Sequence, residues 1–162
     1  MLRNRSSYKK LRILCAWIGG VALVLFSRIN DATFRIGVPF LVFGECIRIW
    51  SLGYMEKKGR TLAVSGPYSF VRNPLYWGNF ILGLGTVLIC NAIWAYFIFV
   101  IGFSIVYIGT IKAEENELEN IFGVPYLNYR AHVSSFLPRL KPWKPPISGW
   151  FQWRRVLKPH EY

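Results

Sequence analysis

Four apolar runs take up a large share of this 162-residue chain and constrain its fold more than any other feature. They cover residues 11–27, 36–54, 75–90 and 92–111. A helix needs about 20 predominantly apolar residues to cross a bilayer, so runs of this length are typical of membrane spans. We therefore predict an all-α fold, a polytopic integral membrane protein with about four transmembrane helices plus cytoplasmic interfacial helices.

The third run contains 16 residues, fewer than a straight span needs, which favours a helix that is tilted, partly interfacial or continuous with the loop before it. It is separated from the fourth run by little more than Asn91, and so short a break predicts a tight helical hairpin. A chain of this length is expected to form a single domain over residues 1–162.

The composition excludes several other classes of protein. Apolar residues make up 53% of the chain and aromatic residues 17%, which contradicts intrinsic disorder. Charged residues make up 17%, below the quarter or so that is usual in soluble domains. The chain has 20 Lys and Arg against 8 Asp and Glu, but a soluble nucleic-acid binder would not carry several long apolar runs. We predict membrane lipid as a partner and no nucleic acid.

The distribution of Lys and Arg predicts the orientation in the membrane. Five lie within the first 12 residues, four fall in the loop 55–74, and eight follow residue 111, whereas only Arg28 and Arg35 would lie on the opposite side. Because positive charge collects on the cytoplasmic side, four spans place both termini in the cytoplasm. No small-residue cleavage site follows the first run, so we interpret it as a retained signal anchor.

Cysteines and common catalytic motifs suggest no other chemistry. Cys15, Cys46 and Cys90 lie far apart in apolar runs without CxxC spacing or His partners, so we predict no disulfide framework and no metal site. P-loop, HExxH and GxSxG motifs are absent from the sequence. The Gly83-Leu84-Gly85 segment lacks the preceding strand of a Rossmann fingerprint, and small residues there favour close helix packing.

One charged pair lies inside the second apolar run. Glu45 and Arg48 are three residues apart, so they share a helix face and can form an ion pair. A charge at membrane depth is costly and indicates a protein interior or a polar cavity. A structural ion pair and a substrate-binding role fit this pattern equally well.

Polar residues concentrate in two segments at the predicted cytoplasmic boundary. In the segment 66–78, two turn prolines and several aromatic residues surround Arg72 and predict a shaped loop. The segment 114–119 contains four of the eight acidic residues. Glu117 and Glu119 fit a solvated helix surface, whereas Glu114 and Glu115 lie at the membrane boundary, where carboxylates can bind a cation or act as a base.

The flanks of the acidic segment give two further expectations. Gly123 and Pro125 predict the end of a helix, and the apolar residues at 118, 121 and 122 form one stripe that should lie against another part of the protein. Residues 141–162 are basic and rich in Trp and Pro, which is typical of an interfacial tail on an anionic leaflet. A disordered basic tail is the alternative.

Taken together, these motifs resemble a known group of enzymes. The pattern G-P-Y-x-x-V-R-N-P-x-Y-x-G at 66–78 is followed by E-E-x-x-L at 114–118, F-G-x-x-Y-x-x-Y at 122–129 and P-R at 138–139. This resembles the integral-membrane methyltransferases of the isoprenylcysteine carboxyl methyltransferase and phospholipid methyltransferase families, over a motif-bearing core of residues 59–140. Asn73 stands where those families usually have His, so a role that needs a titrating imidazole is lost.

The resemblance implies S-adenosylmethionine as cofactor, bound without a Rossmann domain at the cytoplasmic face, and a lipid-borne or hydrophobic small-molecule acceptor that enters from the bilayer. It implies catalytic roles for Arg72, Glu115 and Arg130. A carboxylate acceptor needs only a cation such as Arg72, Arg130 or Arg48 to orient it, whereas an amine acceptor needs a base, a role implied for Glu115 or Glu45. The implied cofactor site consists of Arg72, Asn73, Pro74, Tyr76, Gly78, Gly83, Gly85, Glu114, Glu115, Tyr126 and Tyr129.

The resemblance favours carboxyl O-methylation of the isoprenylcysteine type and leaves three alternatives. The first is phospholipid N-methylation, because an N-P-x-Y-W-G form resembles the phosphatidylethanolamine branch. The second is a sterol-type reductase that uses NADPH. The third is a membrane homologue that has lost activity.

Overall fold

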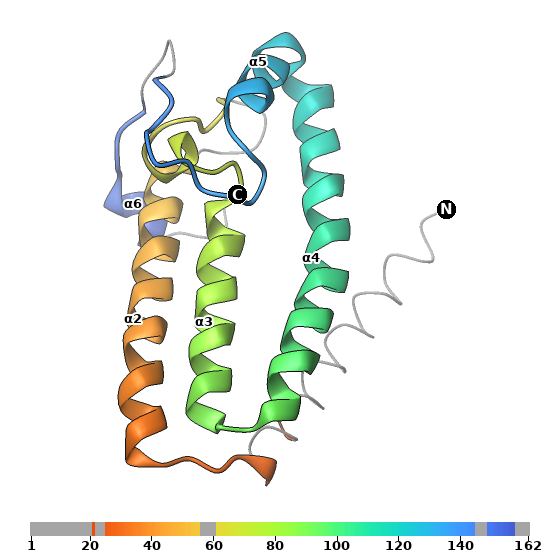
Figure 1. Cartoon of the computed structure of the whole chain (residues 1–162). Helices are drawn as coiled ribbons and strands as arrows, with labels where there is room; N and C mark the ends of the chain where they lie inside the picture. Colours follow the sequence, from red (N-terminus) through yellow and green to blue (C-terminus); the bar gives the residue numbers. More distant parts are fainter. Residues whose placement is uncertain (1–20, 22–24, 56–60, 145–148, 158–162) are drawn as a thin grey trace.

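Helices form the body of the molecule. The computed structural model describes residue 21 and residues 25–55, 61–144 and 149–157, and these contain helices and loops but no strand. The elements are α2 (Asp31–Tyr54), the 3₁₀-helix η1 (Gly66–Ser69), α3 (Pro74–Cys90), α4 (Ile93–Phe122), α5 (Val124–His132) and α6 (Trp153–Leu157). Figure 1 shows α2, α3 and α4 side by side, with the short elements gathered at one end.

The predicted all-α fold is confirmed for the described residues. α2 and α4 are long and apolar enough to cross a membrane, and α3 is a shorter apolar helix of 17 residues. Most of the predicted first span, residues 11–27, lies outside the described residues. Parts of the predicted interfacial tail, residues 145–148 and 158–162, also lie outside them.

Local capping and turn residues set the ends of the long helices. α2 begins at Asp31 because Asn30 and Thr33 form a reciprocal capping box, with Thr33 N 3.0 Å from Asn30 Oδ1. The predicted hairpin is confirmed at Asn91, which joins α3 to α4 in the left-handed conformation at φ 50°. α4 continues through the acidic segment as one helix of 30 residues and ends before Gly123, as predicted.

Glycines hold α2 close to α3. A Cβ atom on Gly44 would lie 2.9 Å from the carbonyl oxygen of Gly78, and one on Gly37 would lie 2.7 Å from that of Gly85. Since real Cβ atoms do not approach so closely, only glycine fits at these crossings. The interpretation that small residues of the Gly83-Leu84-Gly85 segment favour close helix packing is therefore confirmed at Gly85.

Aromatic rings fill the seam between α3 and α4. Phe80 stacks on Phe99 with ring centroids 5.5 Å apart, and Phe103 stacks on Tyr107 at 4.1 Å. Phe136, from the loop after α5, meets both Phe80 and Phe103. This ring cluster connects the membrane-facing part of the helices to the loops at their end.

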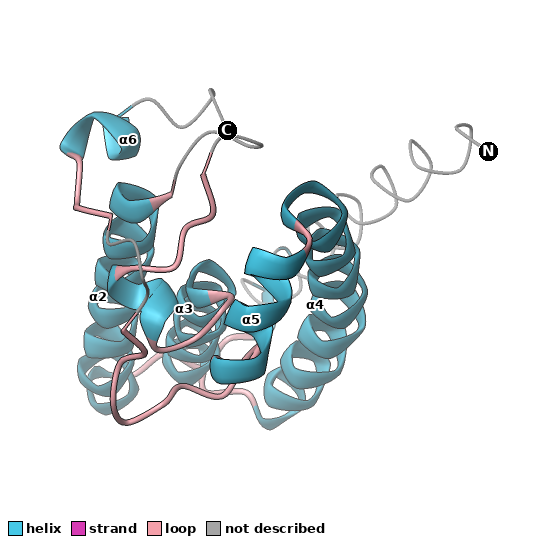
Figure 2. Ribbon diagram, turned by 90° about the horizontal axis from the view of Figure 1, so that it is seen from above, coloured by secondary structure: helices cyan, strands magenta, loops and turns pink. Residues whose placement is uncertain are grey.

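The loops and α5 form a second core at that end. Tyr126, Tyr129 and Val133 are buried and pack against Leu118 and Phe122 of α4. The expectation that the apolar stripe would lie against another part of the protein is therefore confirmed for these two residues. Seen from above, α5 lies across the ends of α3 and α4 (Figure 2).

The carboxy-terminal segment lies along the same end of the molecule. Trp143 N donates to the carbonyl of Ser69 at 3.0 Å, and Gln152 N donates to that of Gly53 at 2.9 Å. Trp150 and Trp153 remain exposed beside two arginines of α6. The described part of the tail is thus held against η1 and α2, and its exposed tryptophans fit the interfacial interpretation.

Candidate functional site

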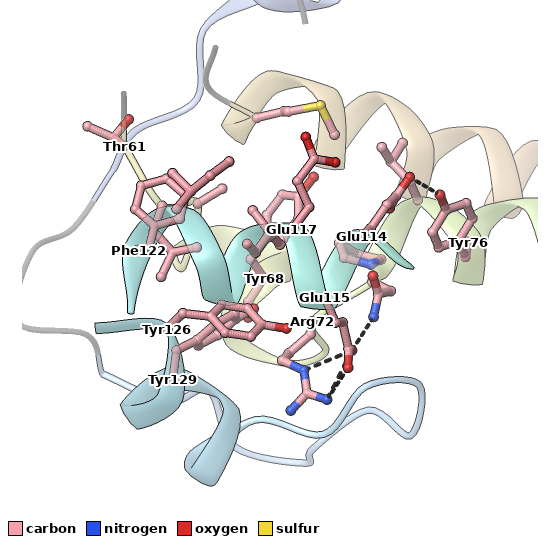
Figure 3. Close-up of a pocket in the computed structure, with 18 of the residues that line it drawn as sticks. Thr61, Tyr68, Arg72, Tyr76, Glu114, Glu115, Glu117, Phe122, Tyr126 and Tyr129 are labelled. Carbon is pink, nitrogen blue, oxygen red and sulfur yellow. Dashed lines mark hydrogen bonds and ion pairs between the residues drawn. The ribbon is translucent and has the colours of Figure 1, made fainter. Parts of the chain in front are cut away.

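A cavity of about 450 Å³ lies at the end of the helix layer that carries η1 and α5. Its walls come from the last turns of α2, the loop 61–63, η1, the start of α3, the end of α4 and α5. Figure 3 shows acidic side chains of α4 and tyrosines of η1 and α5 around it. Eight residues of the implied cofactor site line this cavity: Arg72, Asn73, Pro74, Tyr76, Glu114, Glu115, Tyr126 and Tyr129.

Four other implied site residues do not line the cavity. Gly78 and Gly85 face α2, and a Cβ on Gly83 would lie 2.1 Å from the ring of Phe99 in α4, so all three serve helix contacts. Arg130 is half-exposed and forms an ion pair with Glu119 at 2.9 Å. Its backbone carbonyl, rather than its guanidinium, reaches the site by accepting a hydrogen bond from Arg72 Nη1.

The pair of Arg72 and Glu115 joins three segments around the cavity. Arg72 Nε and Nη2 donate to the Glu115 carboxylate at 3.0–3.1 Å, and Nη1 donates to the carbonyls of Arg130 and Val133 at 3.0 and 2.8 Å. All three nitrogens of the guanidinium therefore donate hydrogen bonds. The two side chains are only 9% and 12% exposed. The pair is therefore a buried, bidentate structural connection.

Glu115 accepts further hydrogen bonds from residues beside the pair. Asn73 Nδ2 lies 3.1 Å and Ser135 Oγ 2.7 Å from Oε1 of Glu115. Asn73 also donates to the carbonyl of Ser135. The asparagine at the position of the family histidine thus acts as a hydrogen-bond donor. Ser135 was not singled out from the sequence, because nothing in its local pattern links it to a glutamate 20 residues away.

Glu114 offers a different environment from Glu115. Its Oε1 accepts a hydrogen bond from the Tyr76 hydroxyl at 2.6 Å, and it forms no ion pair among the described residues. Glu117 is exposed, as expected of a solvated surface, but it also lines the cavity. The acidic helix face is therefore part of the site and not merely a solvated surface.

Three buried tyrosines, from η1 and α5, also line the cavity. Tyr129 donates its hydroxyl hydrogen to the carbonyl of Tyr68 at 2.6 Å. The hydroxyls of Tyr68 and Tyr126 are buried and have no hydrogen-bond partner among the described residues. Burial, and secondarily the charge of Glu115, raises the pKa of Tyr126 to about 12, and burial also raises the pKa of Tyr68 and Tyr129. All three are therefore neutral hydroxyl donors at physiological pH.

Arg48 and Asn79 also line the cavity, on the side formed by α2 and α3. The predicted ion pair is confirmed, with Arg48 Nε 3.1 Å from Glu45 Oε2. Asn79 was not singled out from the sequence. A single amide in an apolar helix carries no local signal of its partner on another helix.

Comparisons with known proteins agree with this arrangement. A family model described as phospholipid methyltransferase matches residues 32–124. The mouse protein-S-isoprenylcysteine O-methyltransferase is 32% identical over 163 residues, an alignment that covers 86% of this chain and 54% of that protein. The cobalt-zinc-cadmium resistance protein CzcN of Cupriavidus metallidurans is 34% identical over 108 residues, covering 65% and 47%. The chain spans about half the length of these curated relatives.

A solved structure supports the fold. The eukaryotic intramembrane Ras methyltransferase ICMT, an isoprenylcysteine carboxyl methyltransferase, superposes with a TM-score of 0.59 at 20% identity, covering 88% of this chain and 56% of that one. The family match extends over more than half of the chain and takes in α2, α3 and α4. By this match, and as its motifs predict, the chain belongs to the phospholipid methyltransferase family of membrane proteins.

Proposed function

We propose that this protein transfers a methyl group from S-adenosylmethionine to a lipid-borne or hydrophobic acceptor, in the manner of an isoprenylcysteine carboxyl O-methyltransferase. The observation that carries the proposal is the cavity at the end of apolar helices, with carboxylates on one wall and buried hydroxyls on another. The family match and the names of the relatives support it.

The residues of the cavity fit this cofactor. S-adenosylmethionine carries a sulfonium and an ammonium group, and Glu114 presents a carboxylate that no described cation neutralises. A buried hydroxyl without a partner costs about 1–3 kcal/mol, so the hydroxyls of Tyr68 and Tyr126 favour a polar ligand. The volume of about 450 Å³ lies within the range usual for small-molecule sites.

When bound, S-adenosylmethionine supplies an electrophilic methyl group on a positively charged sulfur. Glu114 would attract this positive charge, and the hydroxyls of Tyr68 and Tyr126 would donate hydrogen bonds to the polar end. Arg72 and Glu115 would act as positioning residues, because their hydrogen bonds hold the start of α3, α4 and the loop after α5 together. In a direct displacement, holding both reactants in line supplies much of the acceleration.

The role expected for Arg130 changes accordingly. Its guanidinium pairs with Glu119 at the surface, whereas its carbonyl accepts a hydrogen bond from Arg72. We propose that Arg130 supports the wall of the site through its backbone. Orientation of the acceptor is then left to a cation that lines the cavity.

One observation favours phospholipid N-methylation as a second candidate. An amine acceptor must lose a proton, and Glu114 is a carboxylate in the cavity that can receive it. Glu115 is less suited to this role, because its Oε1 already accepts hydrogen bonds from Arg72, Asn73 and Ser135. A carboxylate acceptor would need no base.

We propose that the cavity opens at the cytoplasmic face, with both termini on that side. α3, at 17 residues, extends about 25 Å, which is less than the roughly 30 Å of the hydrocarbon core, so it completes a span where the bilayer thins locally or the loop before α3 extends it. Described basic residues concentrate at the cavity end, whereas the hairpin end carries Arg28 and Arg35. This asymmetry follows the positive-inside rule.

Calorimetry on the detergent-purified chain tests the proposed function. S-adenosylmethionine should bind, and NADPH run beside it should not. Tyr126→Phe should weaken S-adenosylmethionine binding by about tenfold without loss of stability, because the hydroxyl it removes has no partner in the described part of the chain.

Tyr129→Phe is the matched variant for this measurement. It removes the hydroxyl that donates to Tyr68 and should lower stability by about 1 kcal/mol, with a smaller effect on affinity. Binding of NADPH alone, or of neither compound by folded protein, would refute methyl transfer from S-adenosylmethionine. An equal loss of affinity in the two variants would remove the Tyr126 hydroxyl from the proposed contacts.

A further inference from the structure

The cation on α2 lies where the cavity meets the membrane-spanning part of the helices. Arg48 precedes the last residue of α2, Tyr54, by six positions, which places it about 9 Å along the helix from its end. It lines the cavity together with the apolar side chains of Leu52 and Met55. A cation at this depth is costly unless it is compensated by a partner or serves a ligand.

The two arginine–glutamate pairs at the cavity differ in how many hydrogen bonds the guanidinium donates and in how far its side chain is exposed. All three guanidinium nitrogens of Arg72 donate hydrogen bonds, and its side chain is 9% exposed. Arg48 is 34% exposed, and its hydrogen bond to a described residue is the one from Nη1 to Asn79 Oδ1. Glu45 Oε2 lies 3.1 Å from Arg48 Nε, yet Nε makes no hydrogen bond. The contact with Glu45 is therefore electrostatic and leaves donors unused.

Helix α3 holds Arg48 in place without neutralising its charge. A Cβ atom on Gly78 would lie 2.6 Å from Arg48 Cγ, so this glycine makes room for the arginine stem. Asn79 accepts from Arg48 and donates through Nδ2 to the Tyr107 hydroxyl at 3.3 Å. Both Gly78 and Asn79 thus position an arginine whose charge is balanced by Glu45 alone among the described ion pairs.

We propose that Arg48 binds an oxyanion of the hydrophobic acceptor, and that Glu45 pairs with Arg48 until the acceptor displaces Glu45. This inference rests on the proposed function and deepens it by assigning the acceptor-binding cation. Glu45 is suited to yield, because its side chain is 51% exposed and, among the described residues, it is held by charge and not by hydrogen bonds. A guanidinium with free N–H groups can bind a carboxylate or a phosphate in bidentate fashion.

The arrangement also separates the two charges that the reaction needs. Arg48 belongs to α2, whereas Glu114 belongs to α4, and α3 lies between these helices (Figure 1). An anionic acceptor at Arg48 and a cationic methyl donor at Glu114 would occupy the same cavity from different walls. The apolar residues beside Arg48 would then receive the chain of the acceptor.

Direct binding of acceptor analogues tests this assignment. The full chain in detergent is titrated with a prenylated cysteine that has a free carboxylate, and with its neutral carboxamide. Arg48→Gln should weaken carboxylate binding by at least about tenfold and leave carboxamide binding unchanged. Glu45→Gln should tighten carboxylate binding several-fold, because the competing anion is gone. Arg35→Gln, on the same helix but away from the cavity, should change neither.

A second arm distinguishes the two sources of an oxyanion. A short-chain phosphatidylethanolamine is compared with the neutral diacylglycerol of the same chain length. A preference for the phospholipid over the diacylglycerol that is lost in Arg48→Gln assigns the site to a phosphate. A preference for the prenylcysteine carboxylate over its carboxamide that is lost in the same variant assigns the site to a carboxylate. Equal losses for charged and neutral probes in folded Arg48→Gln would overturn the proposal. If Arg48→Gln misfolds, the absence of tightening in Glu45→Gln would still overturn it.

Cofactor affinity keeps this test separate from the proposed function. S-adenosylmethionine binding is measured by calorimetry on the same variants and should remain unchanged in Glu45→Gln. If S-adenosylmethionine does not bind the natural chain, methyl transfer is refuted while the oxyanion titrations still decide the role of Arg48. If S-adenosylmethionine binds but the protein prefers neither the carboxylate nor the phospholipid over its neutral analogue, only the proposed role of Arg48 is refuted.

Discussion

Arg72 contributes more to the stability of the site than to its chemistry. Arg72→Ala would leave the Glu115 carboxylate largely buried without its cation and free the carbonyls of Arg130 and Val133. Breaking such a pair from one side costs about 3–5 kcal/mol. We expect a clear drop in the thermal unfolding midpoint of the detergent-solubilised protein, together with loss of S-adenosylmethionine affinity.

The surface pair of Arg130 and Glu119 provides the control. Its side chains are 47% and 39% exposed, and exposed pairs contribute about 0–1 kcal/mol. Glu119→Gln should therefore leave the unfolding midpoint nearly unchanged. If Arg72→Ala proves as mild as Glu119→Gln while affinity is lost, Arg72 contacts the ligand directly and the positioning role is wrong.

At the residue scale, the sequence predicts site residues where local signals surround them. Arg72 and Asn73 stand between turn prolines, and Glu114 and Glu115 stand at the end of an apolar run. Ser135 and Asn79 lack such signals, because their partners lie 20 and 31 residues away in the chain. For the same reason the motif could not show that Gly78 in α3 makes room for the side chain of Arg48 in α2.

At the element scale, helix ends are predicted well where a cap or turn residue fixes them. Asn91 and Gly123 are such residues, and both adopt positive φ. The continuity of α4 is harder to read, because its apolar and acidic halves have different compositions but contain no breaker between Ile93 and Phe122. α5 has only nine residues, and its packing through Tyr126 and Tyr129, more than its local pattern, explains why it forms.

The contact between α2 and α3 depends on glycine. A Cβ atom in Gly44→Ala would lie 2.9 Å from the backbone oxygen of Gly78 and 2.9 Å from Leu82 N, so one helix must move. Because Arg48 lies one turn after Gly44 in α2 and Asn79 directly follows Gly78 in α3, the cavity should be disturbed as well. We expect a loss of about 1–3 kcal/mol, measured by thermal unfolding in detergent.

Gly102→Ala on α4 is the matched substitution. No atom of the described residues lies within 4 Å of the position of its Cβ atom, so the change should be neutral or should stabilise by up to about 1 kcal/mol through helix propensity. Equal destabilisation by both substitutions would show that glycine acts through the helix backbone and not through the crossing of α2 and α3.

At the scale of the whole molecule, charge and apolar surface are arranged along one axis. α4 exposes large apolar side chains, among them Phe97, Ile101 and Ile105, as a helix facing lipid would. The described basic side chains concentrate beyond it, around the cavity. This arrangement follows from the sequence of apolar runs and basic loops, whereas the cavity itself arises only when segments distant in the chain meet.

Cysteine labelling in membrane vesicles tests this orientation. With the three native cysteines replaced, Leu140→Cys reports on the cavity end and Ala32→Cys on the opposite end. Leu140 is fully exposed and Ala32 lies in the first turn of α2, so both should react freely. A membrane-impermeant maleimide should label Leu140→Cys only in inside-out vesicles and Ala32→Cys only in right-side-out vesicles.

Labelling after solubilisation shows that both thiols are reactive, so a missing signal in vesicles reflects the membrane and not the protein. The reversed pattern would place the cavity outside the cell. That orientation would violate the positive-inside rule and would separate the cavity from an intracellular methyl donor. Labelling of both positions from one side would mean that α2 does not cross the bilayer. In that case Arg48 would lie at the surface, and the cost of burying its charge would no longer explain the pairing with Glu45.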